Sequence, residues 1–132
     1  MGIVVGKQIM IWAQNPGQDE NNEGSELVGK SGQWWWKELA RVGIKRSDCD
    51  IQNVQRCASM DREDGRWVMR DPTKEELRCC SIYTRQAIDK QKARIWIVLG
   101  KIAEDQIFGR HRKDSEKIFY HGDIHVFILD HP

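Results

Sequence analysis

The chain has 132 residues, and its 21 lysines and arginines nearly balance 20 aspartates and glutamates, for a formal net charge of +1. This balance excludes a protein that binds polyanions through bulk positive charge, although a local basic patch remains compatible with it. With 39% hydrophobic and 31% charged residues, the composition is that of a folded domain rather than a disordered chain, and the length fits one domain over residues 1–132.

No apolar run approaches the roughly 18 residues that are needed to cross a bilayer. Residues 1–13 lack the cationic start and the small-residue cleavage site of a secretory signal. We therefore expect a cytoplasmic protein without a membrane partner. The four cysteines (Cys49, Cys57, Cys79 and Cys80) include no CxxC pair, so reduced thiols are the default expectation and metal or cluster ligation is the alternative.

Short apolar runs alternate with helical patterns along the chain. The run at 8–13 predicts a buried strand, which the turn signal Asn15-Pro16-Gly17 ends. The later predictions are, in chain order, a helix at 33–42, a strand at 50–54, an irregular surface excursion at 58–71, a helix from 72 to about 91, a strand at 95–99, a short helix at 101–108 and a last strand at 123–129. This order favours an α/β fold with three layers (α/β/α) and a mainly parallel central sheet.

Ligands of such folds bind beyond the carboxyl ends of the strands. The residues that follow the predicted strands are Gln14 to Gly17, Asn53, Gly100 and His131-Pro132. These side chains can hydrogen-bond a nucleobase, and no Ser-His-Asp nucleophile accompanies them. The strand ends therefore indicate a binding site for a polar, planar ligand.

Six tryptophans are more than a core of this size needs, and three of them are consecutive at 34–36. The spacing of the helix at 33–42 places Trp35, Leu39 and Val42 on one face. Because three consecutive residues cannot share a face of a helix, we expect at least one tryptophan to face solvent, a ligand or a partner. The basic segment 110–113 is either a solvated turn or a phosphate contact.

Six collinear segments carry further information. They are Ala13-Gln14-Asn15-Pro16-Gly17 with Asp19-Glu20, Leu27-Val28-Gly29-Lys30-Ser31-Gly32, Asn53-Val54-Gln55-Arg56-Cys57, Pro72-Thr73 with Glu76 and Cys80, Ile97-Val98-Leu99-Gly100 with Ala103, and His131-Pro132. In this order they resemble motifs of the uracil-DNA glycosylase superfamily, in particular its family 4, the iron–sulfur branch. The resemblance implies a base-excision repair enzyme that flips uracil, or a related deaminated base, out of DNA and hydrolyses its bond to the sugar.

The resemblance also implies catalytic roles for three residues. Gln14 and Asn15 occupy the motif that positions the attacking water, and His131 donates a hydrogen bond to the uracil oxygen on which negative charge develops. Family 4 usually has glutamate at the position of Gln14, whereas the Asn15-Pro16-Gly17 form occurs in branches where an amide orients the water. Because an amide cannot accept a proton, we expect slower chemistry than in a carboxylate-bearing relative.

Four further residues are implied to bind the substrate. Asn53 reads the uracil edge, because its amide offers a donor and an acceptor together. Pro16 and Gly17 belong to the loop in which the backbone approaches the nucleotide, and Leu27 stands where the family has an aromatic residue that stacks on uracil. The expected partner is DNA, either single-stranded or containing uracil.

Family 4 carries a four-iron four-sulfur cluster on four cysteines. Cys57 and Cys80 match two of these ligands, which leaves a cluster and two free thiols as alternatives. Relative to the family, we expect a domain shortened at both ends. The alternative function is a catalytically weak or inactive relative that binds single-stranded or uracil-containing DNA with its tryptophans, and a structural domain of a larger assembly is a third reading.

Overall fold

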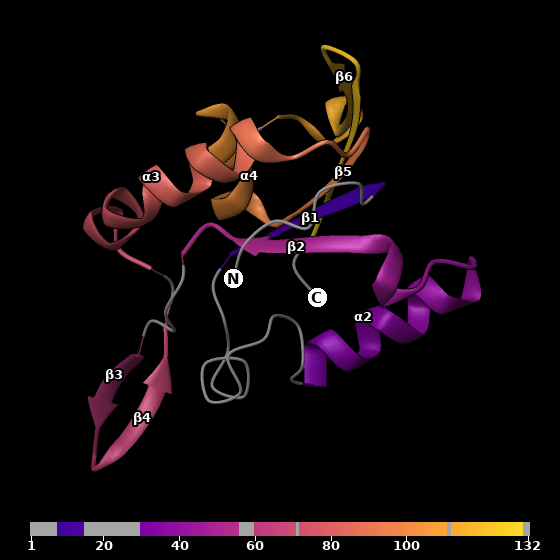
Figure 1. Ribbon diagram of the computed structural model, residues 1–132. Helices are drawn as coiled ribbons and strands as arrows, with labels where there is room; N and C mark the ends of the chain where they lie inside the picture. The colour runs from indigo at the N-terminus through magenta and orange to yellow at the C-terminus, as the bar shows by residue number, and fades with distance from the viewer. Residues whose placement is uncertain (1–7, 15–29, 56–59, 71, 111, 131–132) are drawn as a thin grey trace.

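A five-stranded sheet with the order β2-β1-β5-β7-β6 forms the centre of the fold (Figure 1). The computed structural model describes residues 8–14, 30–55, 60–70, 72–110 and 112–130. The elements in this part of the chain are β1 (Ile9–Ala13), α2 (Lys30–Arg41), the short helix η1 (Arg46–Asp48), β2 (Cys49–Asn53), β3 (Met60–Glu63), β4 (Arg66–Met69), α3 (Lys74–Lys90), β5 (Ile95–Leu99), α4 (Lys101–Phe108), the short helix η2 (Asp114–Glu116), β6 (Ile118–His121) and β7 (Ile124–Leu129).

Four neighbouring strands of the sheet, β2, β1, β5 and β7, are parallel, and the edge strand β6 pairs antiparallel with β7. Helix α2 lies on one side of the sheet, and α3 and α4 lie on the other (Figure 1). The prediction of a three-layer α/β/α fold with a mainly parallel sheet is therefore confirmed. No helix among the described residues is both long enough and apolar enough to span a bilayer.

Helix α2 covers the sheet through one apolar stripe. Trp35 and Leu39, four residues apart on one helix face, are buried in a cluster with Ile11, Ile51 and other residues of β1, β2 and β5. The prediction that Val42 shares this face is wrong, because the helix ends at Arg41 and the side chain of Val42 is 72% exposed in the turn that follows.

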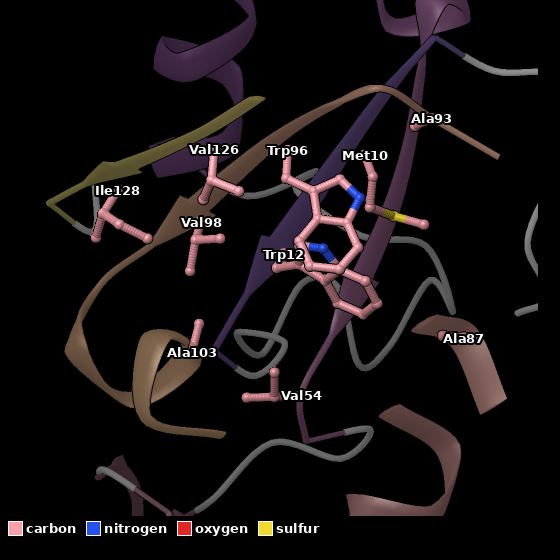
Figure 2. Close-up of a cluster of buried hydrophobic side chains, with 10 residues drawn as sticks. All are labelled: Met10, Trp12, Val54, Ala87, Ala93, Trp96, Val98, Ala103, Val126 and Ile128. Atoms are coloured by element: carbon pink, nitrogen blue, oxygen red, sulfur yellow. The ribbon is translucent and has the colours of Figure 1, made fainter. Parts of the chain in front are cut away.

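The opposite face of the sheet packs against α3 and α4 around two tryptophans. Trp12 and Trp96 are fully buried, and their rings meet edge to face with centroids 5.4 Å apart. Figure 2 shows them among the aliphatic side chains of the same cluster, with Ala87 contributed by α3 and Ala103 by α4. Large rings from adjacent strands thus fill the space beneath the two helices.

Residues 60–69 form a hairpin rather than the irregular excursion that the charged sequence predicted. Among the strands that the structure describes, β3 and β4 pair only with each other, and they project from the body of the fold (Figure 1). Between them, Asp64 and Gly65 have φ angles of 47° and 77°, as a two-residue type I′ turn requires. The Asp-Gly pair was the available signal for this hairpin, but the consecutive charged residues of β3 favoured an irregular segment.

The strand β6 was also missed by the sequence prediction, which placed a single strand at 123–129. The chain reverses through Gly122, whose φ is 61°, and Asp123, so that His121 lies opposite Ile124. A positive φ at the first position of a two-residue turn favours glycine. The last strand is therefore the second arm of a hairpin rather than an isolated parallel strand.

Helix α3 begins where its sequence predicts. The Thr73 hydroxyl accepts a hydrogen bond from the backbone N–H of Glu76, and the Glu76 carboxylate accepts one from the backbone N–H of Thr73. This reciprocal capping box satisfies two amides that the helix itself leaves unpaired. The helix runs to Lys90, one residue short of the predicted end.

Candidate functional site

The carboxyl ends of the four parallel strands meet at one edge of the sheet. Ala13 of β1 lies opposite Asn53 of β2, and Leu99 of β5 lies opposite Leu129 of β7. Because β1 and β5 are also in register, all four strands end together. Folds of this class bind their ligands outside this edge of the sheet.

Gln14 and Asn53 are brought together at this edge by a ladder that continues past the strands. The backbone N–H of Val54 donates to the carbonyl of Ala13, and that of Gln55 donates to the carbonyl of Gln14, both at 2.9 Å. These bonds hold the backbone of Gln14 beside that of β2. Both Gln14 and Asn53 are half-buried, so each is anchored by its strand and still reachable from the edge.

The side-chain amide of Asn53 has no hydrogen-bond partner within the described part of the chain. Strand alternation places this side chain on the face of the sheet that α2 covers, the face to which Ile51 also contributes. A carboxamide carries one carbonyl acceptor and two N–H donors. Asn53 can therefore pair with a ligand edge that itself presents an acceptor and a donor.

Gly100 turns the chain from β5 into α4 at the same edge. Its φ of 89° lies in the left-handed region, which costs a side-chain-bearing residue energy that glycine avoids. Its N–H donates to the carbonyl of Leu129 at 2.8 Å. This bond holds the end of β5 beside the end of β7 at the carboxyl edge of the sheet.

The other predicted site residues lie outside the described part of the chain. They are Asn15, Pro16, Gly17, Leu27, Cys57 and His131. Their roles stay predictions. The structure thus places Gln14, Asn53 and Cys80, and it brings the backbones of the first two side by side at the carboxyl edge.

Arg70 attaches the β3–β4 hairpin to the first turn of α3. Its Nε donates to Asp61 Oδ1 at 2.9 Å, and its Nη1 and Nη2 donate to the two carboxylate oxygens of Glu76 at 2.6 and 3.3 Å. A bidentate pair of this kind fixes orientation as well as distance. The Arg70 guanidinium, helped by the backbone N–H of Thr73, lowers the pKa of Glu76 to about 2.

This lowered pKa predicts a pH dependence of stability. The folded state favours the Glu76 carboxylate, so its contribution is complete above the ordinary pKa of 4.5 and is lost as the pH falls through the folded value of about 2. Urea unfolding measured at a series of pH values is expected to show a steeper loss of stability over this window in the wild type than in Glu76→Gln. The control is Glu75→Gln, at an exposed position of the same helical turn. Parallel pH profiles for the wild type and Glu76→Gln would contradict the prediction.

The sequence of the chain was compared with those of known protein families. Residues 4–132 match the model of the Uracil DNA glycosylase superfamily. The chain belongs to this superfamily. The resemblance drawn from the six segments is thereby confirmed at the level of the family.

Among its relatives in the superfamily are type-4 uracil-DNA glycosylases. That of Archaeoglobus fulgidus is 31% identical over 101 residues, which are 76% of this chain and 47% of the relative. That of Pyrobaculum aerophilum is 32% identical over 116 residues, or 88% and 54%, and that of Saccharolobus solfataricus is 28% identical over 137 residues, or 95% and 60%. The chain spans about half the length of the curated relatives that it matches.

A four-iron four-sulfur cluster requires four cysteine thiolates that lie close together. Cys80 is half-buried on α3, whereas Cys49 is buried in the cluster beneath α2, on the other side of the sheet. The described residues hold no group of three or more His, Cys, Asp or Glu side chains that could bind a metal ion. Cys49 therefore lies across the sheet from Cys80 and does not join it, and Cys57, the other cysteine that matches a cluster ligand of the family, lies outside the described residues. No step of the chemistry proposed below is routed through a cluster.

A buried acid of this superfamily member escaped the sequence prediction. Glu104, in the first turn of α4, is fully buried and accepts hydrogen bonds from the backbone N–H of Arg112 at 2.8 Å and from Lys117 Nζ at 3.0 Å. It thereby ties the segment that precedes β6 to the helix. An acidic residue in the first turn of a helix is ordinary, so the sequence held no signal of its burial.

The basic segment 110–113 is divided by the fold. The Arg112 guanidinium lies over the ring of Phe119, 3.7 Å from its centroid, and packs inward. Arg110 and Lys113 are exposed. Of the two readings weighed for this segment, phosphate contact is thus open to the exposed cations, while Arg112 serves the packing of α4 against β6.

Proposed function

We propose that the chain is a uracil-DNA glycosylase domain that removes uracil, or a related deaminated base, from DNA. The observation that carries the proposal is the match to the superfamily over residues 4–132. The relatives bear the name type-4 uracil-DNA glycosylase, and the half-buried Gln14 and Asn53 stand at the edge where this fold class binds ligands.

Base recognition falls to Asn53. The target nucleotide leaves the stack at a cost of a few kcal/mol, and its Watson–Crick edge is read in the pocket. Uracil presents a carbonyl oxygen beside an N–H, which the Asn53 amide complements with its own N–H and carbonyl oxygen. The Asn53 side-chain amide, which has no partner among the described residues, supports this role.

The chemistry is hydrolysis of the N-glycosidic bond. The bonding electrons leave with the base while the sugar gains oxocarbenium character. A water oxygen then bonds to the sugar carbon, and the proton that this water loses passes through solvent to the departing uracil anion. His131 stabilises the charge on the departing uracil oxygen by donating a hydrogen bond, and Gln14 and Asn15 orient the water. Two amides in place of a carboxylate base make a slow enzyme.

The preferred substrate is single-stranded or uracil-containing DNA. A DNA substrate accords with the cytoplasmic location that the sequence predicts. The near-neutral net charge of +1 indicates that affinity for the phosphate backbone comes from local contacts rather than from the whole surface.

Release of free uracil from a single-stranded, uracil-containing oligonucleotide tests the proposal. The wild-type chain is expected to release uracil, and Asn15→Ala is expected to do so about tenfold more slowly, because it no longer orients the water. Release no faster than that of Asn15→Ala would overturn the enzyme assignment. DNA binding without base release would instead support the binding-module alternative.

A further inference from the structure

The three consecutive tryptophans of α2 have three different environments. Trp35 is buried beneath the helix, and Trp36 is half-buried with the Arg46 guanidinium 5.0 Å from its ring centroid. Trp34 is 54% exposed, and no aromatic ring or cation of the described residues lies against it. The core accounts for Trp35, and Arg46 partly covers Trp36, whereas the Trp34 ring has no such packing role among the described residues.

Two cations continue the exposed face on which Trp34 lies. Lys37 and Arg41 are exposed and follow Trp34 at i+3 and i+7, a spacing that sets all three residues in one stripe of the helix. The stripe is about 10 Å long, the span of about three stacked nucleotides. Glu38 contacts Arg41 at 3.7 Å on the exposed surface, and an exposed ion pair of this kind contributes little, so Arg41 can exchange it for a phosphate.

The stripe starts on the half of α2 that lies toward the carboxyl edge of the sheet. After α2, residues 42–48 lead to Cys49, at the amino end of β2, where the Cys49 thiol donates to the carbonyl of Lys45. The last turn of α2 therefore lies toward the amino edge of the sheet and its first half toward the carboxyl edge. Trp35, next to Trp34, belongs to the same buried cluster as Ala13, the register partner of Asn53.

We propose that Trp34, Lys37 and Arg41 bind the DNA strand that flanks the nucleotide held at the carboxyl edge. The Trp34 indole stacks on a base, and the two cations contact backbone phosphates, which is how proteins hold single strands without reading their sequence. A large open ring followed by cations complements a strand of alternating bases and phosphates. The inference rests on the proposed function in one respect, namely that the occupant is DNA.

Binding of an end-labelled, uracil-free single strand of about 16 nucleotides, followed by fluorescence anisotropy, tests the surface apart from catalysis. Trp34→Ala is expected to weaken binding about tenfold, because base–aromatic stacking is lost, and Trp34→Phe is expected to retain most of the affinity. The double variant Lys37→Ala/Arg41→Ala is expected to reduce the slope of log affinity against log salt by about 1.4 in magnitude, as two lost phosphate contacts require.

The controls are an exposed ring and exposed cations elsewhere on the molecule. Tyr120→Ala removes a ring of β6 that is 71% exposed, and Lys90→Ala/Lys92→Ala removes two exposed lysines from the connection into β5. Both controls are expected to bind the strand like the wild type. Equal losses in the controls, unchanged affinity in Trp34→Ala, or no binding by the wild type would overturn the inference.

Uracil release measured on the same preparations separates the two proposals. Strand binding that depends on Trp34 without any base release would retain the surface and overturn the glycosylase assignment. Base release by a chain whose strand affinity is independent of Trp34 would support the glycosylase assignment and overturn the binding surface.

Discussion

Replacing Glu104 by alanine is expected to lower the free energy of unfolding by about 3–5 kcal/mol. The carboxylate is fully buried and accepts from both Lys117 Nζ and the backbone N–H of Arg112. Its removal leaves the ammonium of Lys117, whose side chain is only 19% exposed, without its counter-charge, and it leaves a backbone donor unpaired. Urea denaturation of the purified chain measures the change.

Two further variants separate the buried charge from the lost side-chain volume. Glu104→Gln keeps an acceptor for the Arg112 N–H and is expected to be less destabilising than Glu104→Ala. In the double variant Glu104→Leu/Lys117→Met both ionic partners become apolar, which is expected to recover part of the loss. Glu116→Ala, at an exposed position of η2, is the control. A Glu104→Ala chain as stable as that control would show that the buried pair contributes nothing.

Changing Asn53 to aspartate is expected to lower kcat/KM for uracil release by about 100-fold or more. A carboxylate only accepts hydrogen bonds, so it cannot donate to the uracil carbonyl. Its negative charge also opposes the charge that develops on the departing base. Single-turnover release from a uracil-containing oligonucleotide measures the loss, and it depends on the glycosylase activity proposed above.

The matched control makes the same amide-to-carboxylate change away from the site. Gln8, exposed just before β1 at the amino edge of the sheet, gives Gln8→Glu, which is expected to release uracil like the wild type. The unfolding free energy of Asn53→Asp shows whether the fold is retained. A folded Asn53→Asp chain with wild-type release would remove Asn53 from base recognition.

Local chemistry in the sequence predicted much of the fold. The uninterrupted apolar run of β5 and the capping residues of α3 identify their elements without help from distant parts of the chain. The β3–β4 hairpin was missed because β3 carries three consecutive charged residues after Met60 and because, among the described residues, the two strands pair only with each other. β3 therefore lacks the apolar alternation by which half-buried strands are recognised. The Asp64-Gly65 pair was the one feature of the sequence that indicated a hairpin.

The residues of the candidate site could be predicted where sheet topology alone determines their position. They could not be predicted where side-chain packing determines it. Parallel strands must end at a common edge, so Gln14 and Asn53 could be placed there from their positions at the ends of two predicted strands. The burial of Glu104 depends on Lys117, 13 residues away along the chain, and no local pattern reports such a partner. Helical spacing required one tryptophan of the triplet to be exposed, but only packing identified it as Trp34.

The separate pairing of β3 with β4 has a consequence for how this region can vary among relatives. None of the backbone hydrogen bonds of the five-stranded sheet involves the hairpin, which is held to α3 by the side chain of Arg70. Residues between β2 and α3 can therefore be gained or lost without shifting the register of the other strands. Sequence alignments across the superfamily are expected to place insertions and deletions here, while the strand ends on either side align without gaps.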